Sequence, residues 1–185
     1  MVTDRSHIQM PESSDTTLFD SNILLKHVTK ELPDGFLMRP LQFNDYEKGY
    51  LSLLGELTSV GKISRGKWNE RFNSMREANG GEQSYYVVVI EDLAKNQVVA
   101  SATLVIEFKF IHGAGSRGRV EDVVCDTAYR GRRFAQGLNT TLVSLAKSLG
   151  VYKISLECKD SLISYYELFG FVKDCGNNFL VQRFD

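Results

Sequence analysis

Apolar and polar residues follow two different spacings along the chain, which predicts an alternation of strands and helices. Short apolar runs rich in valine and aromatic residues, bounded by turn residues, are typical of strands. Apolar residues three and four positions apart are typical of helices with one buried face. Strands are predicted at 35–42, 84–92, 97–110, 119–125, 151–158, 171–174 and 178–185, and helices at 44–57, 64–79, 134–149 and 160–170.

Capping signals place the helix ends more closely. Asn44, with Glu47 three residues later, makes a capping-box-like start for the first helix. Ser64 is expected to cap the second helix, and Gly80 with Gly81 to end it. The third helix has its apolar face at Phe134, Leu138, Leu142, Leu145 and Leu149, and the fourth has an apolar stripe at Leu162, Tyr165 and Phe169 that leaves Tyr166 on another side.

The order of these elements predicts the fold class. Hairpin-like strand pairs are mixed with strand–helix–strand connections, so we expect an α/β or α+β domain with helices on both faces of a mixed sheet. Residues 35–185 are expected to form this single domain. Residues 1–34 are mostly polar and are expected to be a mobile tail, in which 18–28 is the one apolar stretch that could pack on the domain.

Composition and charge exclude several classes of function. The chain has 22 Lys plus Arg and 23 Asp plus Glu, a net charge of −1, which argues against a nucleic-acid-binding protein. Three cysteines without a CxxC pair and three scattered histidines predict neither a disulfide framework nor a metal site. No apolar run is long enough for a membrane span, and the amino terminus lacks an apolar signal core, so we expect a cytoplasmic protein.

The sequence "RGRRFAQG" at 130–137 follows a predicted strand and opens a predicted helix. The first N–H groups of a helix lack partners and carry partial positive charge, and arginines add to it. This combination can bind a phosphate or pyrophosphate. A basic loop on a solvated surface explains the same residues, and the turn by itself leaves both interpretations open.

Two neighbouring carboxylates, Glu121 and Asp122, interrupt the apolar strand before this turn. Successive residues of a regular strand point to opposite faces, so both can enter one cleft only if the strand bulges. Either they face a wet cleft or they lie at a strand end in solvent. Tyr166 could donate a proton through its hydroxyl, although a packed aromatic ring with a wet tip is the commoner fate of a tyrosine.

The turn "RGRRFA" together with "YELFGF" at 166–171 resembles the GNAT superfamily of acetyl-CoA-dependent N-acetyltransferases. The stretches "EFKFIH", "RGRVEDVV", "YKISLEC" and "SYYELFGF" resemble those of its members that acetylate glucosamine 6-phosphate. The resemblance covers residues 33–185. It implies a mixed, partly splayed central sheet, acetyl-CoA as co-substrate, no metal, a homodimer, and a place in the pathway to UDP-N-acetylglucosamine.

The resemblance also implies roles for individual residues. It implies that Tyr166 protonates the departing thiolate and that Asp122 and Glu121 meet the amine. The cofactor would contact Val123, Val124, Cys125, Arg130, Gly131, Arg132, Arg133, Phe134, Ala135, Gln136 and Tyr166. The sugar phosphate would contact Thr58, Lys109, Phe110, Ile111, His112, Glu121, Asp122, Tyr152, Lys153, Glu157 and Arg183, the last of these reaching into the neighbouring subunit.

Two positions depart from the family pattern. The superfamily usually has glycine where this chain has Arg133, and often has asparagine where it has Leu162.

We expect direct transfer in a ternary complex without an acetyl-cysteine intermediate, because no histidine partner for Cys125 or Cys158 is visible. Two other functions stay open, namely acetylation of a protein amine or polyamine and non-catalytic CoA binding.

Overall fold

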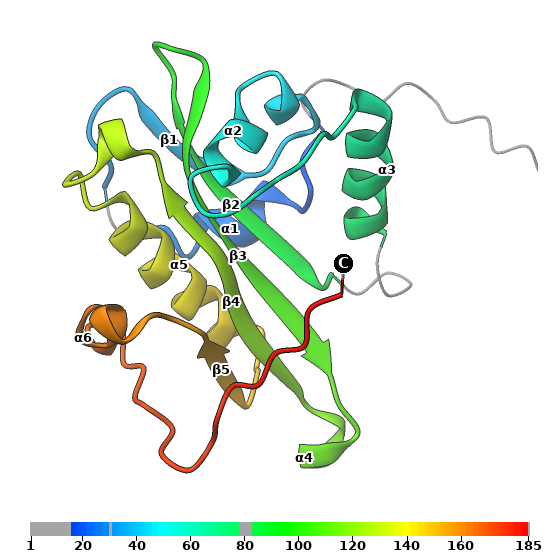
Figure 1. The fold of residues 1–185 in the computed structure, drawn as a ribbon, viewed down its shortest axis with the longest axis vertical. Coiled ribbons are helices and arrows are strands. Elements are labelled where there is room, and N and C mark those ends of the chain that lie inside the picture. Colours follow the sequence, from blue (N-terminus) through cyan, green and yellow to red (C-terminus); the bar gives the residue numbers. More distant parts are fainter. Residues whose placement is uncertain (1–15, 30, 78–82, 185) are drawn as a thin grey trace, which may run out of the picture.

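The protein is built around one five-stranded sheet in the order β1-β2-β3-β4-β5 (Figure 1). A computed structural model describes residues 16–29, 31–77 and 83–184. The strands β1 to β4 pair antiparallel, whereas β4 and β5 pair parallel. Their bounds are Phe36–Pro40 (β1), Tyr85–Asp92 (β2), Gln97–Phe108 (β3), Ser116–Cys125 (β4) and Lys153–Leu156 (β5).

Helices cover both faces of this sheet, which confirms the predicted fold class. The α-helices are α1 (Ser21–Leu25), α2 (Tyr50–Leu54), α3 (Arg65–Arg76), α4 (Ile111–Ala114), α5 (Phe134–Ser148) and α6 (Ile163–Glu167), and the 3-10 turns are η1 (Phe43–Tyr46), η2 (Thr127–Tyr129) and η3 (Asp160–Leu162). The long helix α5 packs on β2, β3 and β4, and α2 packs on β3 and β4 from the opposite face. The core between these layers is a continuous apolar cluster.

The segment 16–29 belongs to this packed fold, so the tail predicted for 1–34 does not extend over it. The side chains of Leu18 and Leu24 are 0% and 1% exposed. The His27 ring lies 3.0 Å from Ser144 Oγ and 3.1 Å from Ser148 Oγ, both on α5. The apolar stretch at 18–28 is therefore what joins this segment to the domain, whereas residues 1–15 lie outside the described part of the chain.

A buried ionic network ties β1 to its neighbours on the α2 side. Arg39 donates hydrogen bonds of 2.8 and 2.7 Å to Asp45 and one of 2.8 Å to Glu91, and Lys48 donates one of 2.7 Å to Glu91. Burial raises the pKa of a carboxyl, but the bonds from Lys48 and Arg39 outweigh it and lower the pKa of Glu91. The network keeps η1 against the sheet, beneath α2 and α3.

The helix predicted at 44–57 is broken into η1 and α2. Gly49 lies between them with φ of 80°, a left-handed conformation that stops a helix and suits glycine. The capping box uses Gln42 and Asp45 instead of Asn44 and Glu47. Ser64 caps α3 as predicted, by accepting from Lys67 N. The predicted stop at 80–81 and the stripe residue at 79 lie outside the described residues.

The two closing strands predicted at 171–174 and 178–185 are wrong for the described residues, which end at 184. Residues 171–184 contain no strand, and their apolar side chains are exposed at Val172, Phe179, Leu180, Val181 and Phe184. The sequence has strand-forming composition there, but a strand exists only when a neighbour completes its hydrogen bonds. In Figure 1 this segment runs from α6 across the sheet as an irregular chain.

Candidate active site

The centre of the site is a bulge in β4 at Asp122. Glu121 lies opposite Thr103, and Val124 lies opposite Ser101, so β4 has one residue more than β3 between these pairs. Asp122 takes up the extra residue with φ of 52°. Aspartate tolerates this left-handed conformation better than most residues. The alternation predicted for a regular strand is thereby broken, and both carboxylates line one pocket.

That pocket, which we call the acid pocket, lies between β4 and the helices α2 and α3, with a volume of about 440 Å³. Its other walls are largely apolar and include Leu41, Tyr50, Leu51, Leu54, Ile63, Trp68, Phe72, Met75, Tyr85, Val87 and Val105, together with Thr103 and Arg71. These walls remove part of the hydration of Asp122 and raise the pKa of its carboxyl, although the residue remains exposed at the pocket mouth.

Glu121 differs from Asp122 because it is already paired. Arg119 donates a 2.9 Å hydrogen bond to Glu121 and one of 2.7 Å to Glu157, the residue that follows β5. Glu121 and Glu157 are therefore held in fixed positions by one guanidinium group. Asp122 has no ion-pair partner among the described residues, so it is the acid that can receive a proton or bind an amine.

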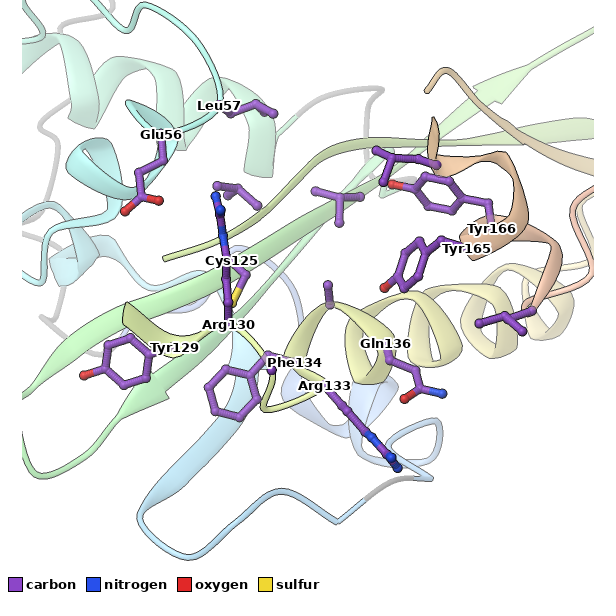
Figure 2. Close-up of a pocket in the computed structure, with 16 residues that line it drawn as sticks. Glu56, Leu57, Cys125, Tyr129, Arg130, Arg133, Phe134, Gln136, Tyr165 and Tyr166 are labelled. Atoms are coloured by element: carbon purple, nitrogen blue, oxygen red, sulfur yellow. The ribbon is translucent and has the colours of Figure 1, made fainter. Parts of the chain in front are cut away.

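A second and larger pocket, which we call the turn pocket, begins on the other side of the bulge (Figure 2). Its volume is about 730 Å³. It runs from β4 along the first turns of α5 to α6, and it is lined by Glu56, Leu57, Val123, Val124, Cys125, Tyr129, Arg130, Gly131, Arg133, Phe134, Ala135, Gln136, Leu162, Tyr165, Tyr166 and Leu168. This list contains every predicted cofactor residue except Arg132.

The start of α5 forms one end of the turn pocket. Gly131 has φ of 80°, and Arg133, the N-cap residue, has φ of 64° and makes no side-chain cap hydrogen bond. Arg130 and Arg133 are both lining residues, although Figure 2 shows the Arg130 side chain extending toward Glu56 and the Arg133 side chain extending away from Cys125 and Tyr166. Arg132 lies over the rings of Phe36 and Tyr129 at 5.4 and 5.5 Å. Backbone N–H groups of a fifteen-residue helix and two guanidinium groups suit a phosphate-bearing ligand.

Tyr165 and Tyr166 of α6 form the opposite end, and both reach into the turn pocket in Figure 2. Tyr166 is 8% exposed, and burial raises the pKa of its hydroxyl to about 12. It therefore stays protonated at ordinary pH and can donate its proton. Burial also raises the pKa of the Cys125 thiol, which argues against a reactive thiolate in this pocket.

Most of the predicted sugar-phosphate residues do not line either pocket. The loop residues Lys109, Phe110, Ile111 and His112 lie at the far end of β3 and β4, where the His112 ring lies on that of Tyr152 with centroids 4.1 Å apart. Lys153 pairs with Arg117 at the same end of β4. Five residue steps along β4 separate Arg117 from Asp122, a distance of roughly 17 Å. Thr58 and Arg183 also lie outside both linings.

Sequence reasoning missed three residues of the turn pocket that carry polar groups, namely Glu56, Tyr129 and Tyr165. Glu56 accepts a 3.0 Å hydrogen bond from Thr127 N and so connects the end of α2 to the turn after β4. Tyr165 was placed on the apolar stripe apart from Tyr166, but both line the pocket because α6 is short and lies along its wall. The paired tyrosines at 165 and 166 were the signal available in the sequence.

The described residues 16–29, 31–77 and 83–184 contain neither a metal cluster nor a membrane-spanning helix. No group of three or more His, Cys, Asp or Glu side chains there could hold a metal ion. No helix in the same part of the chain has the length and apolar character that crossing a membrane requires.

Comparison with known proteins agrees with this geometry. Residues 54–171 match the model of the acetyltransferase (GNAT) family. A Drosophila melanogaster protein named probable glucosamine 6-phosphate N-acetyltransferase is 42% identical, over 96% of this chain and 85% of that protein. The Candida albicans glucosamine 6-phosphate N-acetyltransferase is 34% identical, over 78% of this chain and 94% of that protein.

Solved structures show the same similarity. The crystal structure of glucosamine-6-phosphate N-acetyltransferase from Arabidopsis thaliana matches with a TM-score of 0.75 at 30% identity, covering 81% of this chain and 99% of that chain. An acetyltransferase from Clostridium acetobutylicum, solved with acetyl-CoA, matches with a TM-score of 0.60 at 18% identity, covering 79% and 96%. The second match supports the fold alone.

Proposed function

Because the chain belongs to the acetyltransferase (GNAT) family, we propose that it transfers the acetyl group of acetyl-CoA to the amine of glucosamine 6-phosphate. The products are N-acetylglucosamine 6-phosphate and CoA. The observation that carries this proposal is the bulge at Asp122, which lies between the acid pocket and the turn pocket. A donor in one pocket and an acceptor in the other would meet at this point of β4.

The turn pocket is the proposed site of acetyl-CoA. Its basic end, with Arg130, Arg133 and the N–H groups at the start of α5, suits the pyrophosphate. The edge of β4 at 123–125, beyond the part that pairs with β5, suits the amides of the pantetheine arm, since backbone groups of a strand pair with amides as they pair with another strand. This placement brings the thioester close to the bulge and to Tyr166.

The reaction we propose is a direct transfer. The amine nitrogen attacks the thioester carbonyl carbon, a C–N bond forms and the C–S bond breaks. Asp122 orients the amine and accepts its proton, and the backbone N–H near Val123 stabilises the developing oxyanion. Tyr166 gives its proton to the departing thiolate. Most of the acceleration would come from holding the two substrates side by side.

In the proposed reaction, binding of the acceptor's phosphate needs residues from a second chain. A sugar phosphate is too short to bridge the roughly 17 Å between Asp122 and Lys153 within one chain. We therefore propose a homodimer in which Arg183, with the loop residues 109–112, completes the site of the neighbouring subunit. The exposed apolar side chains of Phe179, Leu180 and Phe184 support a partner at the carboxyl-terminal segment.

Release of CoA thiol from acetyl-CoA tests the function directly. Glucosamine 6-phosphate, glucosamine and a polyamine are offered in parallel, with the Tyr166→Phe variant as matched control. Fast release with the phosphosugar alone supports the proposal. Release with the polyamine alone would move the assignment to another acetyltransferase. A folded protein that binds CoA but releases thiol with none of these acceptors would contradict the proposal and favour a CoA-binding role.

The product has a further use that the family resemblance suggests. An N-acetylated hexosamine 6-phosphate is the form needed for the pathway to UDP-N-acetylglucosamine, and we propose this pathway and a cytoplasmic setting for the protein. Extracts of cells that lack the protein should accumulate glucosamine 6-phosphate and lose the acetylated sugar. Unchanged levels of both sugars would contradict this placement.

A further inference from the structure

The wall of the turn pocket contains a buried polar pair that the proposed chemistry does not use. Asn139 of α5 is 0% exposed, and its Nδ2 donates a 2.8 Å hydrogen bond to Ala135 O. Its Oδ1 and the hydroxyl of Tyr165 are both buried, and among the described residues neither has a hydrogen bond of standard geometry. Buried polar atoms without partners are costly, so this pair needs an explanation.

Asn139 can satisfy the hydrogen-bonding need of the Tyr165 hydroxyl. Asn139 lowers the pKa of the Tyr165 hydroxyl by hydrogen bonding, although burial raises it more. A hydrogen bond that lowers the pKa of a phenol is donated to its oxygen, so the second hydrogen of Asn139 Nδ2, whose first is donated to Ala135 O, is the donor to the Tyr165 hydroxyl. In Figure 2 the Tyr165 hydroxyl points toward α5, whereas the Tyr166 hydroxyl points toward β4.

The position of Tyr165 connects this pair to Tyr166. Its ring meets that of Tyr166 edge to face, with centroids 5.1 Å apart, and that of Phe169 at 5.2 Å. The helix α6 that carries both tyrosines has five residues. A helix of this length is not stable alone and keeps its place only through contacts with the rest of the fold. Leu162, at its start, lines the same pocket but offers no polar atom.

We propose that Tyr165 is a positioning residue for Tyr166, docked by its hydroxyl on Asn139 of α5. The inference rests on the proposed function, in which Tyr166 is the proton donor. Tyr165 fixes the rotation of α6 against α5, and its ring forms one side of the space that Tyr166 occupies. A proton donor must lie within hydrogen-bond reach of the leaving sulfur, so a small displacement of α6 lowers turnover without weakening substrate binding.

The test compares Tyr165→Phe in two backgrounds. In the wild-type background we expect kcat to fall roughly 10-fold with both KM values unchanged. In the Tyr166→Phe background the same change should alter kcat less than about 2-fold, because the residue through which it acts is gone. A similar fall in both backgrounds would show a general structural role and overturn the inference, as would an unchanged kcat in the wild type.

The partner of Tyr165 is tested by Asn139→Leu. It should lower kcat as Tyr165→Phe does, and the double variant should fall no further than either single one. If a single variant fails to fold, the double variant removes both buried polar atoms and carries the same test. Tyr46→Phe is the control. It deletes a part-buried hydrogen bond from a tyrosine hydroxyl to Ile63 O, at a place away from α6. It should change stability but not kcat.

The controls separate this inference from the proposed function. A wild type that acetylates no phosphosugar contradicts the function, and the inference fails with it. An active wild type with an unaffected Tyr166→Phe variant contradicts the proton-donor role and the inference but not the reaction. An active wild type that depends on Tyr166 while Tyr165→Phe and Asn139→Leu keep full kcat contradicts the inference alone.

Discussion

Arg119 Nε donates a 2.9 Å hydrogen bond to Glu121, two residues along β4, and so leaves the neighbouring Asp122 as the unpaired acid of the bulge. The two carboxylates are adjacent in sequence and share a pocket, but their surroundings differ. Glu121 is paired with the Arg119 guanidinium group. Asp122 is partly desolvated, and this raises its pKa.

Activity should therefore have an acid limb set by Asp122. Only the ionised carboxylate orients the amine and accepts its proton, so kcat/KM should rise with pH through a pKa above the usual value of about 4 for aspartate. Asp122→Asn should lower kcat about 100-fold and remove this limb. Asn tolerates the left-handed backbone, whereas an Asp122→Ala control also strains it. A limb unchanged in Asp122→Asn would assign the titration to another group.

Asp122 also predicts a pH-dependent change in stability. Ionisation of its carboxyl should promote activity but lower the stability of the fold. Because its folded pKa is raised, ionisation of Asp122 opposes folding as the pH rises through that value. Asp122→Asn should therefore raise Tm near about pH 7 and leave it unchanged below about pH 4, where the carboxyl is protonated in both states. Thermal unfolding at the two pH values measures this. An equal Tm shift at both would contradict the raised pKa.

Tyr166→Phe should lower kcat about 100-fold with little change in either KM. The hydroxyl acts only after the amine attacks, so binding does not depend on it. Because its pKa is about 12, wild-type kcat should not fall between about pH 8 and pH 10 through loss of this proton. Steady-state rates over this range are the measurement. An alkaline fall that disappears in Tyr166→Phe would mean that the pKa is much lower.

Arg133→Gly should stabilise the protein. Arg133 has φ of 64° at the N-cap of α5, and a non-glycine residue in this conformation costs about 1 kcal/mol, part of which glycine loses again as backbone entropy. Denaturation midpoints should rise for Arg133→Gly but not for Arg133→Ala, which loses the same charge and keeps the strain. Equal midpoints for the two variants would locate the effect in the charge.

Asp45→Asn should be strongly destabilising, by about 3–5 kcal/mol. It removes one charge from a network in which Arg39 and Asp45 are 7% and 0% exposed, and leaves the guanidinium partly uncompensated. Glu47→Gln, in the exposed pair with Arg65, is the matched control and should cost less than about 1 kcal/mol. Urea titrations of both variants decide whether burial of the network has this consequence.

Mixing two inactive variants tests the shared site. If Arg183 completes the site of the neighbouring subunit, Tyr166→Phe and Arg183→Ala chains refolded together should recover activity, because each mixed dimer contains one site with neither change. About a quarter of all sites would be intact in a random mixture. Each variant refolded alone should remain poor. Recovery that never exceeds the average of the two separate samples would place Arg183 in its own chain's site, or in none.

The features that the sequence predicted well are those set by local pattern. The helix at 134–149 and the hairpin at 84–110 follow from apolar spacing, and the turn at 130–133 lies between a strand and a helix as its sequence indicates. The shared pocket of Glu121 and Asp122 could be stated only as a condition, because alternation assumes a regular strand. The bulge depends on pairing with β3, and pairing is not a local property.

Other features were missed for the same reason. The strands expected at 171–174 and 178–185 have strand-forming residues but no neighbouring strand within the described chain. The spacing of Tyr165 places it on an apolar stripe. The role proposed for its hydroxyl depends on Asn139, which belongs to a different helix, and so could not be predicted from local spacing. The left-handed Gly49 divides a helical pattern that apolar spacing alone would continue.

The packing of residues 16–29 also sets an order of events during synthesis. His27 contacts Ser144, which follows it by 117 residues, so this segment leaves the ribosome long before α5 exists. Leu18 and Leu24 must remain without their final neighbours until the sheet and α5 have formed. The first described residues to be made are therefore among the last to reach their final contacts, because their neighbours on α5 follow them by more than a hundred residues.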